Sequence, residues 1–316
     1  MRKVLAKSTA AALLSLVFGN TLVAAAPLKV VSSFSILADM VGQVGGDKVE
    51  SLVIVGPEGD AHSFEPRPSD SKTLQDADLL IINGAQFEEW LPRLVASAGY
   101  KGKVIEAIEG VPLRAYEEEE HHQESEPHSE DGHHHHEHHH GEYDPHAWQS
   151  LDYAQRYVAN IQQALAEADP ANTAYYEQRA AAYEAQLKTL QANMQEAFSQ
   201  LPATHRTVVT SHDAFAYLGQ DYDIEFLPLL GASNQAEPSA KELAGLIEFM
   251  RDNQVKAVFV ENTSSPKLLE QIARETGAKV GEVLYSDALA KAPHPAATYL
   301  GLMQWNTEAL LKALQD

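Results

Sequence analysis

Residues 28–55 read LKVVSSFSILADMVGQVGGDKVESLVIV, and this stretch decides the fold class. Its first six residues form a short β-rich run, residues 36–44 have the spacing of an amphipathic helix that ends at a Gly-Gly pair, and residues 49–55 indicate a second strand. A strand, a helix and another strand in succession are typical of parallel pairing, with helices packed on the faces of the sheet. We therefore expect an α/β fold.

The same alternation continues along the chain and starts afresh beyond its middle. The further strands that we expect are 79–83, 103–108, 207–210, 224–227, 257–261 and 279–284, and the later helices are 238–251, 266–276 and 296–314. A chain of 316 residues is long enough for two domains. We expect two α/β lobes with parallel sheets, an N-terminal lobe at 27–170 and a C-terminal lobe at 202–316.

The segment between these lobes has a different composition. Residues 172–200 are rich in Ala, Glu, Gln, Leu, Lys and Arg and contain no Gly or Pro, which favours a helix roughly 40 Å long. Asn172 is expected to cap its start, and Pro202 lies just beyond its end. The apolar positions do not keep the heptad of a coiled coil. We predict a rigid helix at 171–201 that connects the lobes.

The first 26 residues have the features of a secretory signal peptide. Basic residues near the start are followed by a mostly apolar run at 10–18 and by small residues that suit a signal peptidase. The alternative, an uncleaved membrane anchor, is disfavoured because the run is too short to span ~30 Å of hydrocarbon. We expect cleavage near Ala25 or Ala26. The chain has no cysteine, so we expect no disulfide, no thiolate metal site and no lipid anchor, and a protein free in the periplasm.

The net charge of −22 is unevenly distributed, because eleven acidic residues and no Lys or Arg lie between residues 117 and 144. Nucleic acids and anionic membranes require clusters of Lys and Arg, so neither is expected as a partner. Residues 117–141 have little to bury, and we expect them to be disordered without metal. They are internal and interrupted, unlike a purification tag. Weak zinc sites are expected at their ten histidines: His121, His122, His128, His133, His134, His135, His136, His138, His139 and His140.

Three other histidines stand in loops that are expected to follow a strand or to precede a helix. His62 lies in GDAHSFEP, His146 in DPHAW and His212 in TSHDAF. Ligands of open α/β sheets bind beyond the carboxyl ends of the strands. Two of these histidines belong to the first lobe and one to the second, so we expect them to converge in the cleft between the lobes.

A lone histidine is more often a hydrogen-bonded structural residue than a ligand, and this alternative applies to each of them. His205 lies in a polar linker and is expected at the surface, and His294 lies between two prolines and is expected to be part of the loop structure. For the other three, the placement in loops at strand or helix ends favours a functional role.

These motifs, together with LYSDAL at 284–289, resemble in order those of the metal-binding solute-binding proteins of ABC importers. That family includes zinc, manganese and streptococcal adhesin receptors, and the resemblance covers nearly all of the chain after the signal peptide. It implies an ABC-type permease with a cytoplasmic ATPase as the partner, and we expect a monomer. The resemblance implies four metal ligands, two from each lobe: His62, His146, His212 and Asp287. Residues expected to orient them are Asp60, which is also a competing carboxylate, Glu65, Asp213 and Glu261.

The choice of metal is argued from the ligand types. Three imidazoles and one carboxylate suit four-coordinate Zn²⁺. The manganese branch of the family has Glu where this chain has His212, and oxygen ligands suit a harder ion. The acidic, His-rich segment also resembles that of ZnuA-type zinc receptors. We therefore predict a receptor that binds zinc as its cargo for import. A receptor for manganese or another divalent metal is the alternative within the family, and copper or nickel could bind in vitro.

Two alternatives come from other classes of protein. A catalytic zinc keeps three protein ligands and a water beside a general base, whereas a fourth ligand is available here. The sequence places no HEXXH motif in an expected helix and contains no GXSXG motif, so we do not expect an enzyme. A zinc-storage protein centred on the His-rich segment would have many equivalent weak sites rather than a single tight one.

Overall fold

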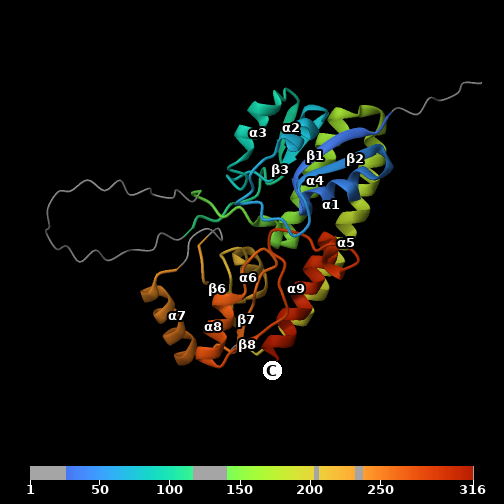
Figure 1. Cartoon of the computed structure of the whole chain (residues 1–316). Coiled ribbons are helices and arrows are strands. Elements are labelled where there is room, and N and C mark those ends of the chain that lie inside the picture. Colours follow the sequence, from blue (N-terminus) through green and yellow to red (C-terminus); the bar gives the residue numbers. More distant parts are fainter. Residues whose placement is uncertain (1–25, 117–140, 203–205, 232–237, 316) are drawn as a thin grey trace, which may run out of the picture.

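The computed structural model describes residues 26–116, 141–202, 206–231 and 238–315. Figure 1 shows two α/β lobes, one above the other, with a long helix beside both. Each lobe contains a four-stranded sheet in which neighbouring strands are parallel. The expected fold class is therefore confirmed. The expected signal peptide, the ten histidines between residues 121 and 140, and His205 lie outside the described residues.

The first sheet has the strand order β2-β1-β3-β4. In its centre, Val31 of β1 is in register with Leu52 of β2 and Leu80 of β3. Val31 is completely buried, as expected for a central parallel strand. The elements of this lobe are β1 (Leu28–Phe34), α1 (Ser35–Gly45), η1 (Gly46–Lys48), β2 (Val49–Val55), α2 (Pro68–Gln75), β3 (Leu79–Ile82), α3 (Leu91–Ala98), β4 (Lys103–Glu106), η2 (Ala147–Gln149), α4 (Leu151–Ala168) and η3 (Pro170–Asn172).

The second sheet has the order β6-β5-β7-β8. Its elements are β5 (Thr207–Thr210), α6 (Ala216–Tyr222), β6 (Glu225–Pro228), α7 (Ala240–Asp252), β7 (Ala257–Val258), α8 (Lys267–Thr276), β8 (Lys279–Val280), η4 (Pro295–Ala297) and α9 (Tyr299–Leu314).

The strands expected at 257–261 and 279–284 are much shorter than predicted. β7 and β8 have two residues each, and beyond them a single isolated bridge joins Glu261 to Leu284. The backbone N–H of Glu261 donates to the hydroxyl of Ser211 at 3.2 Å. This N–H is therefore bonded to a side chain, whereas in a regular sheet it would bond to a backbone carbonyl of the neighbouring strand. The sheet therefore gives way to irregular backbone where the two segments approach the cleft.

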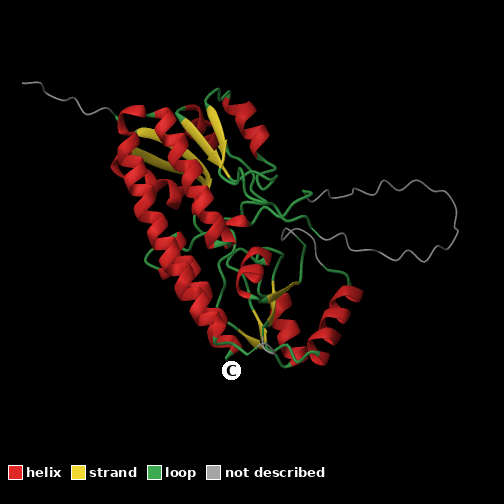
Figure 2. Ribbon diagram, turned by 180° about the vertical axis from the view of Figure 1, so that it is seen from behind, coloured by secondary structure: helices red, strands yellow, loops and turns green. Residues whose placement is uncertain are grey.

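The long helix α5 (Thr173–Ser199) runs along both lobes (Figure 2) and contacts α1 and α4 of the first lobe and α6 and α9 of the second. The expected connecting helix is present, but its expected cap is wrong. The side chain of Asn172 donates to the carboxylate of Asp169 at 2.7 Å and makes no capping hydrogen bond. The turn η3 that precedes the helix brings these two side chains together.

The hydrophobic core is shared between the lobes on the α5 side. One cluster of buried side chains includes Val31 of the first lobe, Tyr183 of α5 and Leu302 of α9, while a smaller cluster around Ile247 and Leu269 lies under α7 and α8. A large apolar contact restricts the relative motion of domains, so we expect the lobes to keep their arrangement. Among the described residues, no helix has both the length and the apolar character needed to cross a membrane.

Candidate metal centre

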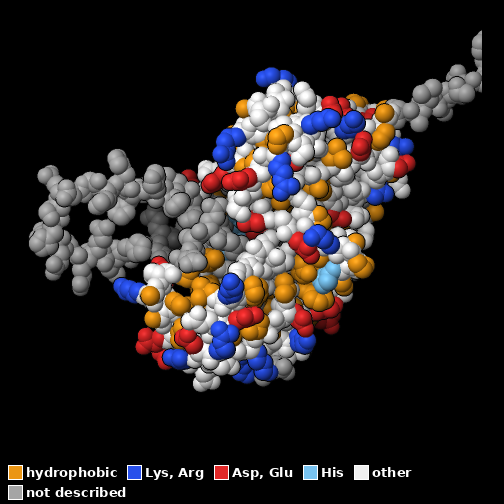
Figure 3. Space-filling view, in the orientation of Figure 1, with side chains coloured by type: hydrophobic (Ala, Val, Ile, Leu, Met, Phe, Trp, Pro, Cys, Tyr) orange, Lys and Arg blue, Asp and Glu red, His pale blue; other side chains and the backbone are white. Residues whose placement is uncertain are grey.

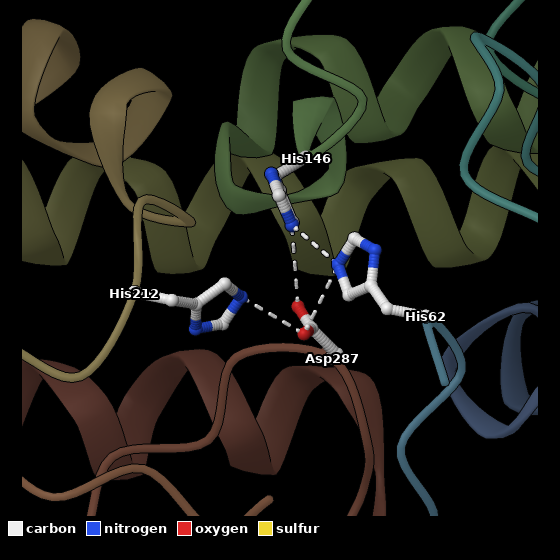
Figure 4. Close-up of side chains that lie close together, drawn as sticks. All are labelled: His62, His146, His212 and Asp287. Carbon is white, nitrogen blue, oxygen red and sulfur yellow. Dashed lines mark hydrogen bonds and ion pairs between the residues drawn. The ribbon is translucent and has the colours of Figure 1, made fainter. Parts of the chain in front are cut away.

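Four side chains from four separate loops meet between the lobes (Figure 4). His62 lies in the loop after β2, and His146 directly precedes the turn η2. His212 follows the carboxyl end of β5, and Asp287 follows the bridge at Leu284. The structure thus brings together all four residues that the resemblance implied, two from each lobe.

The nitrogen and oxygen atoms of these side chains are closely spaced. The Nε2 atoms of His62 and His146 are 3.1 Å apart, and Nε2 of His212 lies 3.0 Å from Oδ2 of Asp287. The carboxylate of Asp287 also lies 3.5 Å from Nε2 of His62 and 3.6 Å from Nε2 of His146. One atom from each of the four lies within 4.8 Å of the others.

These separations suit one small divalent ion. Four donors at roughly 2.0–2.2 Å from a tetrahedral zinc are about 3.3–3.6 Å from one another, and four of the separations, taken to either oxygen of Asp287, lie between 3.0 and 3.6 Å. Nε2 of His212 and both oxygens of Asp287 are buried, and within the described residues no hydrogen bond of good geometry satisfies them. Buried polar atoms of this kind require a partner, and a bound cation would be one.

The site is nearly closed to solvent. The side chains of His146, His212 and Asp287 are completely buried, and that of His62 is 10% exposed. His62 packs edge-on against Phe87, with ring centroids 4.6 Å apart. Exclusion of water strengthens every electrostatic interaction among these groups. His62 is therefore the member of the cluster nearest to solvent.

The burial and the neighbouring charges perturb two of the four groups strongly. Burial alone would lower the pKa of His212, but the carboxylates of Glu261 and Asp287 raise that pKa well above its ordinary value of 6.5. Burial alone would raise the pKa of Asp287, but His212, His146 and His62 hold that pKa below its ordinary range. His212 and Asp287 therefore each favour the charged form of the other.

Two carboxylates contact two of the clustered histidines on the side away from the other clustered atoms. Oδ1 of Asp144 lies 2.7 Å from Nδ1 of His146, and Oε2 of Glu261 lies 2.5 Å from Nδ1 of His212. Each carboxylate also accepts a hydrogen bond from the backbone N–H of the same histidine, at 2.9 Å. Such contacts fix the ring orientation and increase the basicity of the imidazole. Glu261 thus lies where the prediction placed an orienting residue.

Asp144 was not predicted in this role, although a signal was present. It stands two residues before His146, as Asp60 stands two residues before His62. In both places a carboxylate oxygen accepts from the backbone N–H of the histidine at 2.9 Å. An Asp-X-His spacing therefore indicates a turn that presents the imidazole.

The other expected orienting residues have different places. Asp60 accepts hydrogen bonds from the backbone N–H groups of His62 and Ser63, at 2.9 and 3.4 Å, and is not one of the four clustered residues. Glu65 is exposed, and its orienting role stays a prediction. Asp213 is half-buried, and burial and then the neighbouring Asp144 raise its pKa.

His294 has the structural role that was expected. Its Nδ1 accepts a hydrogen bond from the backbone N–H of Ala296 at 3.1 Å. Its ring packs against Tyr285 and Trp305, with centroids 5.2 and 4.6 Å away. It is not among the four clustered residues.

Comparison with known proteins agrees with this geometry. The family model described as ZnuA, zinc-uptake complex component A, periplasmic, matches residues 30–313. The chain belongs to this family. Its members are metal-binding periplasmic solute-binding proteins of ABC importers, which are receptors rather than enzymes. The resemblance that was stated from the motifs is thereby confirmed, and the clustered His and Asp side chains support the binding of a divalent metal.

Individual relatives cover almost the whole chain. The iron-binding protein YfeA of Yersinia pestis is 31% identical over 315 residues, which cover 96% of this chain and 95% of YfeA. A manganese-bound mutant of a periplasmic metal-binding protein from Candidatus Liberibacter asiaticus has a TM-score of 0.79 at 30% identity. The periplasmic zinc-binding protein TroA of Treponema pallidum has a TM-score of 0.80 at 26% identity. Each of these two structural comparisons covers 91% of this chain and 99% of the other.

Proposed function

We propose that this protein is a receptor that binds Zn²⁺ as its cargo and delivers it to an ABC-type permease for import. The observation that carries the proposal is the donor set, in which three imidazoles and one carboxylate from both lobes lie within 4.8 Å of one another. Mostly nitrogen donors with one oxygen suit zinc in four-fold coordination. In this proposal the ligands are His62, His146, His212 and Asp287.

The number of donors supports capture rather than catalysis. A catalytic zinc keeps one position for water or substrate, with a general base beside it. Here four protein groups are close enough to fill a tetrahedral shell, and the two carboxylates beside the histidines, Asp144 and Glu261, are occupied with the ring Nδ1 atoms. The proposed role is therefore to enclose the ion and release it to a partner.

Manganese is the second candidate cargo. A manganese-bound structure and an iron-binding protein are among the similar proteins, beside the zinc-binding TroA. Manganese prefers oxygen donors, whereas imidazole suits zinc. We rank zinc first because His212 supplies a third nitrogen.

The remaining parts of the proposal concern the setting of the site. We propose a cleft between lobes at 27–170 and 202–316, joined by the helix at 171–201. The protein would act as a monomer in the periplasm, after removal of residues 1–26, with a membrane permease and its cytoplasmic ATPase. On the face shown in Figure 3, basic and acidic side chains are interspersed, with no broad basic patch. The segment 117–141 would collect zinc weakly.

Calorimetric titration of metal-free protein tests this proposal. Zinc and manganese are titrated separately into the chain with and without residues 117–141. We expect one tight zinc site in both forms, weaker binding of manganese, and additional weak zinc sites only when the segment is present. His212→Ala should weaken the tight site far more than His134→Ala. Tighter binding of manganese, or equal losses in the two variants, would contradict the proposal.

A further inference from the structure

The loop that follows β3, residues 83–90, contacts the chain directly before both histidines of the first lobe. The side-chain Nδ2 of Asn83 donates a hydrogen bond to the carbonyl oxygen of Pro145 at 3.0 Å. The indole Nε1 of Trp90 donates one to the carbonyl oxygen of Ala61 at 2.7 Å. Each of these carbonyls belongs to the residue before a clustered histidine. One loop therefore holds the peptide units that present two of the proposed ligands.

The same loop also supports the histidine rings by packing. Phe87 lies edge-on to His62 at 4.6 Å and to His146 at 6.0 Å between centroids. It also packs against Trp148 and Phe34, at 4.9 and 5.0 Å. Any displacement of the loop would therefore be transmitted to both rings.

The carboxylate of Glu88, near the end of this loop, is hydrogen-bonded to the backbone at the start of the loop. Its Oε1 accepts hydrogen bonds from the backbone N–H of Asn83 at 2.7 Å and from the hydroxyl of Ser33 at 2.6 Å. Its Oε2 accepts from the backbone N–H of Gly84 at 3.3 Å. Gly84 and the two residues after it, Ala85 and Gln86, all have positive φ angles. Such angles are unfavourable for residues other than Gly and persist only where the surroundings enforce them.

Glu88 is an unusual choice for a purely structural position. Its side chain is buried, and among the described residues no salt bridge joins it to a Lys or Arg. Burial raises its pKa to about 7, against the hydrogen bonds that lower it. A buried carboxylate without a cation is costly. Stability alone would favour a neutral group here.

We propose that Glu88 is a positioning residue that sets the separation of His62 and His146, and thereby the affinity of the cleft for its divalent metal. This inference rests on the proposed function, because it assumes that both histidines are ligands. Their Nε2 atoms, 3.1 Å apart, are separated in sequence by more than eighty residues, and the loop 83–90 is a structure that contacts both of their segments.

The test compares Glu88→Gln with the unchanged chain. Gln has nearly the same size, but its single oxygen can accept from Asn83 and Ser33 only by turning the NH₂ group toward the backbone N–H of Gly84, from which that group cannot accept a hydrogen bond. Zinc affinity is measured by competition with a chelator, and the ligand geometry by the visible absorption of the Co²⁺-loaded protein. We expect zinc to bind ~10–100-fold more weakly and the cobalt bands to change. Ser33→Ala should cause a smaller loss in the same direction.

A matched control separates positioning from general destabilisation. Val44→Ala removes buried side-chain volume in the last turn of α1, and it should lower the unfolding temperature without altering zinc affinity or the cobalt spectrum. Unchanged affinity and spectrum in Glu88→Gln, or an equal loss in Val44→Ala, would overturn the inference. If Glu88→Gln does not fold, unchanged affinity in Ser33→Ala overturns it. Absence of a tight zinc site in the unchanged chain would instead refute the proposed function.

Discussion

Oε2 of Glu261 lies 2.5 Å from Nδ1 of His212, and both side chains are completely buried. The same glutamate accepts a hydrogen bond from the backbone N–H of His212 at 2.9 Å. It therefore holds the ring from two directions and leaves Nε2 facing Asp287 at 3.0 Å. The arrangement increases the basicity of His212 and fixes the position of the Nε2 atom that could bind a metal.

Glu261→Gln should weaken zinc binding by ~10–100-fold, because the imidazole loses a negative partner that orients it. The affinity is measured by competition with a chelator at constant pH. Glu270→Gln, an exposed change on α8, is the control and should leave the affinity unchanged. Equal affinities in all three proteins would show that Glu261 has no role at the site.

Zinc affinity should fall with decreasing pH, starting above pH 6.5. The pKa of His212 is raised above 6.5 by Glu261 and Asp287 despite its burial. Below that raised pKa the imidazole of His212 is protonated, and zinc must displace the proton. Above that pKa the ring nitrogen is free to bind zinc. Titrations between about pH 5 and 8 in buffers of different ionisation enthalpy would measure the protons released.

In Glu261→Gln the pKa of His212 should be lower, so the decline of affinity should begin at a lower pH. An affinity that stays constant down to about pH 4.5, where carboxylates rather than imidazoles titrate, would contradict three histidine ligands.

His212→Glu should shift the metal preference from zinc toward manganese, because the site would then have two nitrogen and two carboxylate donors. The introduced carboxylate would lie beside Glu261, and two buried like charges repel. The informative variant therefore combines His212→Glu with Glu261→Gln. We expect the ratio of zinc to manganese affinity to fall on the order of tenfold or more. A ratio that is unchanged would refute His212 as the discriminating residue.

The order of strands and helices could be predicted because hydrophobic periodicity is a local property of the chain. The sequence immediately around Val30 and Val31 is enough to predict a buried strand. The lengths of β7 and β8 could not be predicted in this way. Beyond β7, the backbone N–H of Glu261 donates to the hydroxyl of Ser211, fifty residues earlier, and a contact between such distant segments has no local pattern.

The candidate site also contains residues that could be predicted from the sequence and residues that could not. His62, His146, His212 and Asp287 were named because their motifs resemble a family in order. Pattern and spacing alone placed only the three histidines in the cleft.

Residues that act through hydrogen bonds between distant segments were missed. Glu88 has no motif of its own, and its partner Ser33 lies 55 positions away. The capping prediction for Asn172 failed for a local reason, because its side chain bonds to the nearby Asp169 instead.

The two lobes are also linked beside the centre, and this link can be tested. Trp148 and Gln149 both donate hydrogen bonds to the carbonyl oxygen of Ser286, each at 2.9 Å. Ser286 directly precedes Asp287, and Trp148 follows closely after His146. Trp148→Phe removes one of these bonds, which is worth about 0.5–1.5 kcal/mol of stability, and should reduce the zinc-induced rise in unfolding temperature.

Trp305→Phe is the matched control, since the indole of Trp305 donates to Val283 within the second lobe at 2.8 Å. It should leave the zinc-induced rise in unfolding temperature intact. The same reduction in both variants would mean that the link between the lobes does not affect the centre.

The most direct measurement of the central claim is a crystal structure of the zinc-loaded protein, with the ion located by its anomalous scattering. The account predicts one zinc between the lobes, with nitrogens of His62, His146 and His212 at about 2.0–2.1 Å and an oxygen of Asp287 at about 2.0–2.2 Å. A zinc with Asp60 within about 2.2 Å and Asp287 remote from the metal would contradict it.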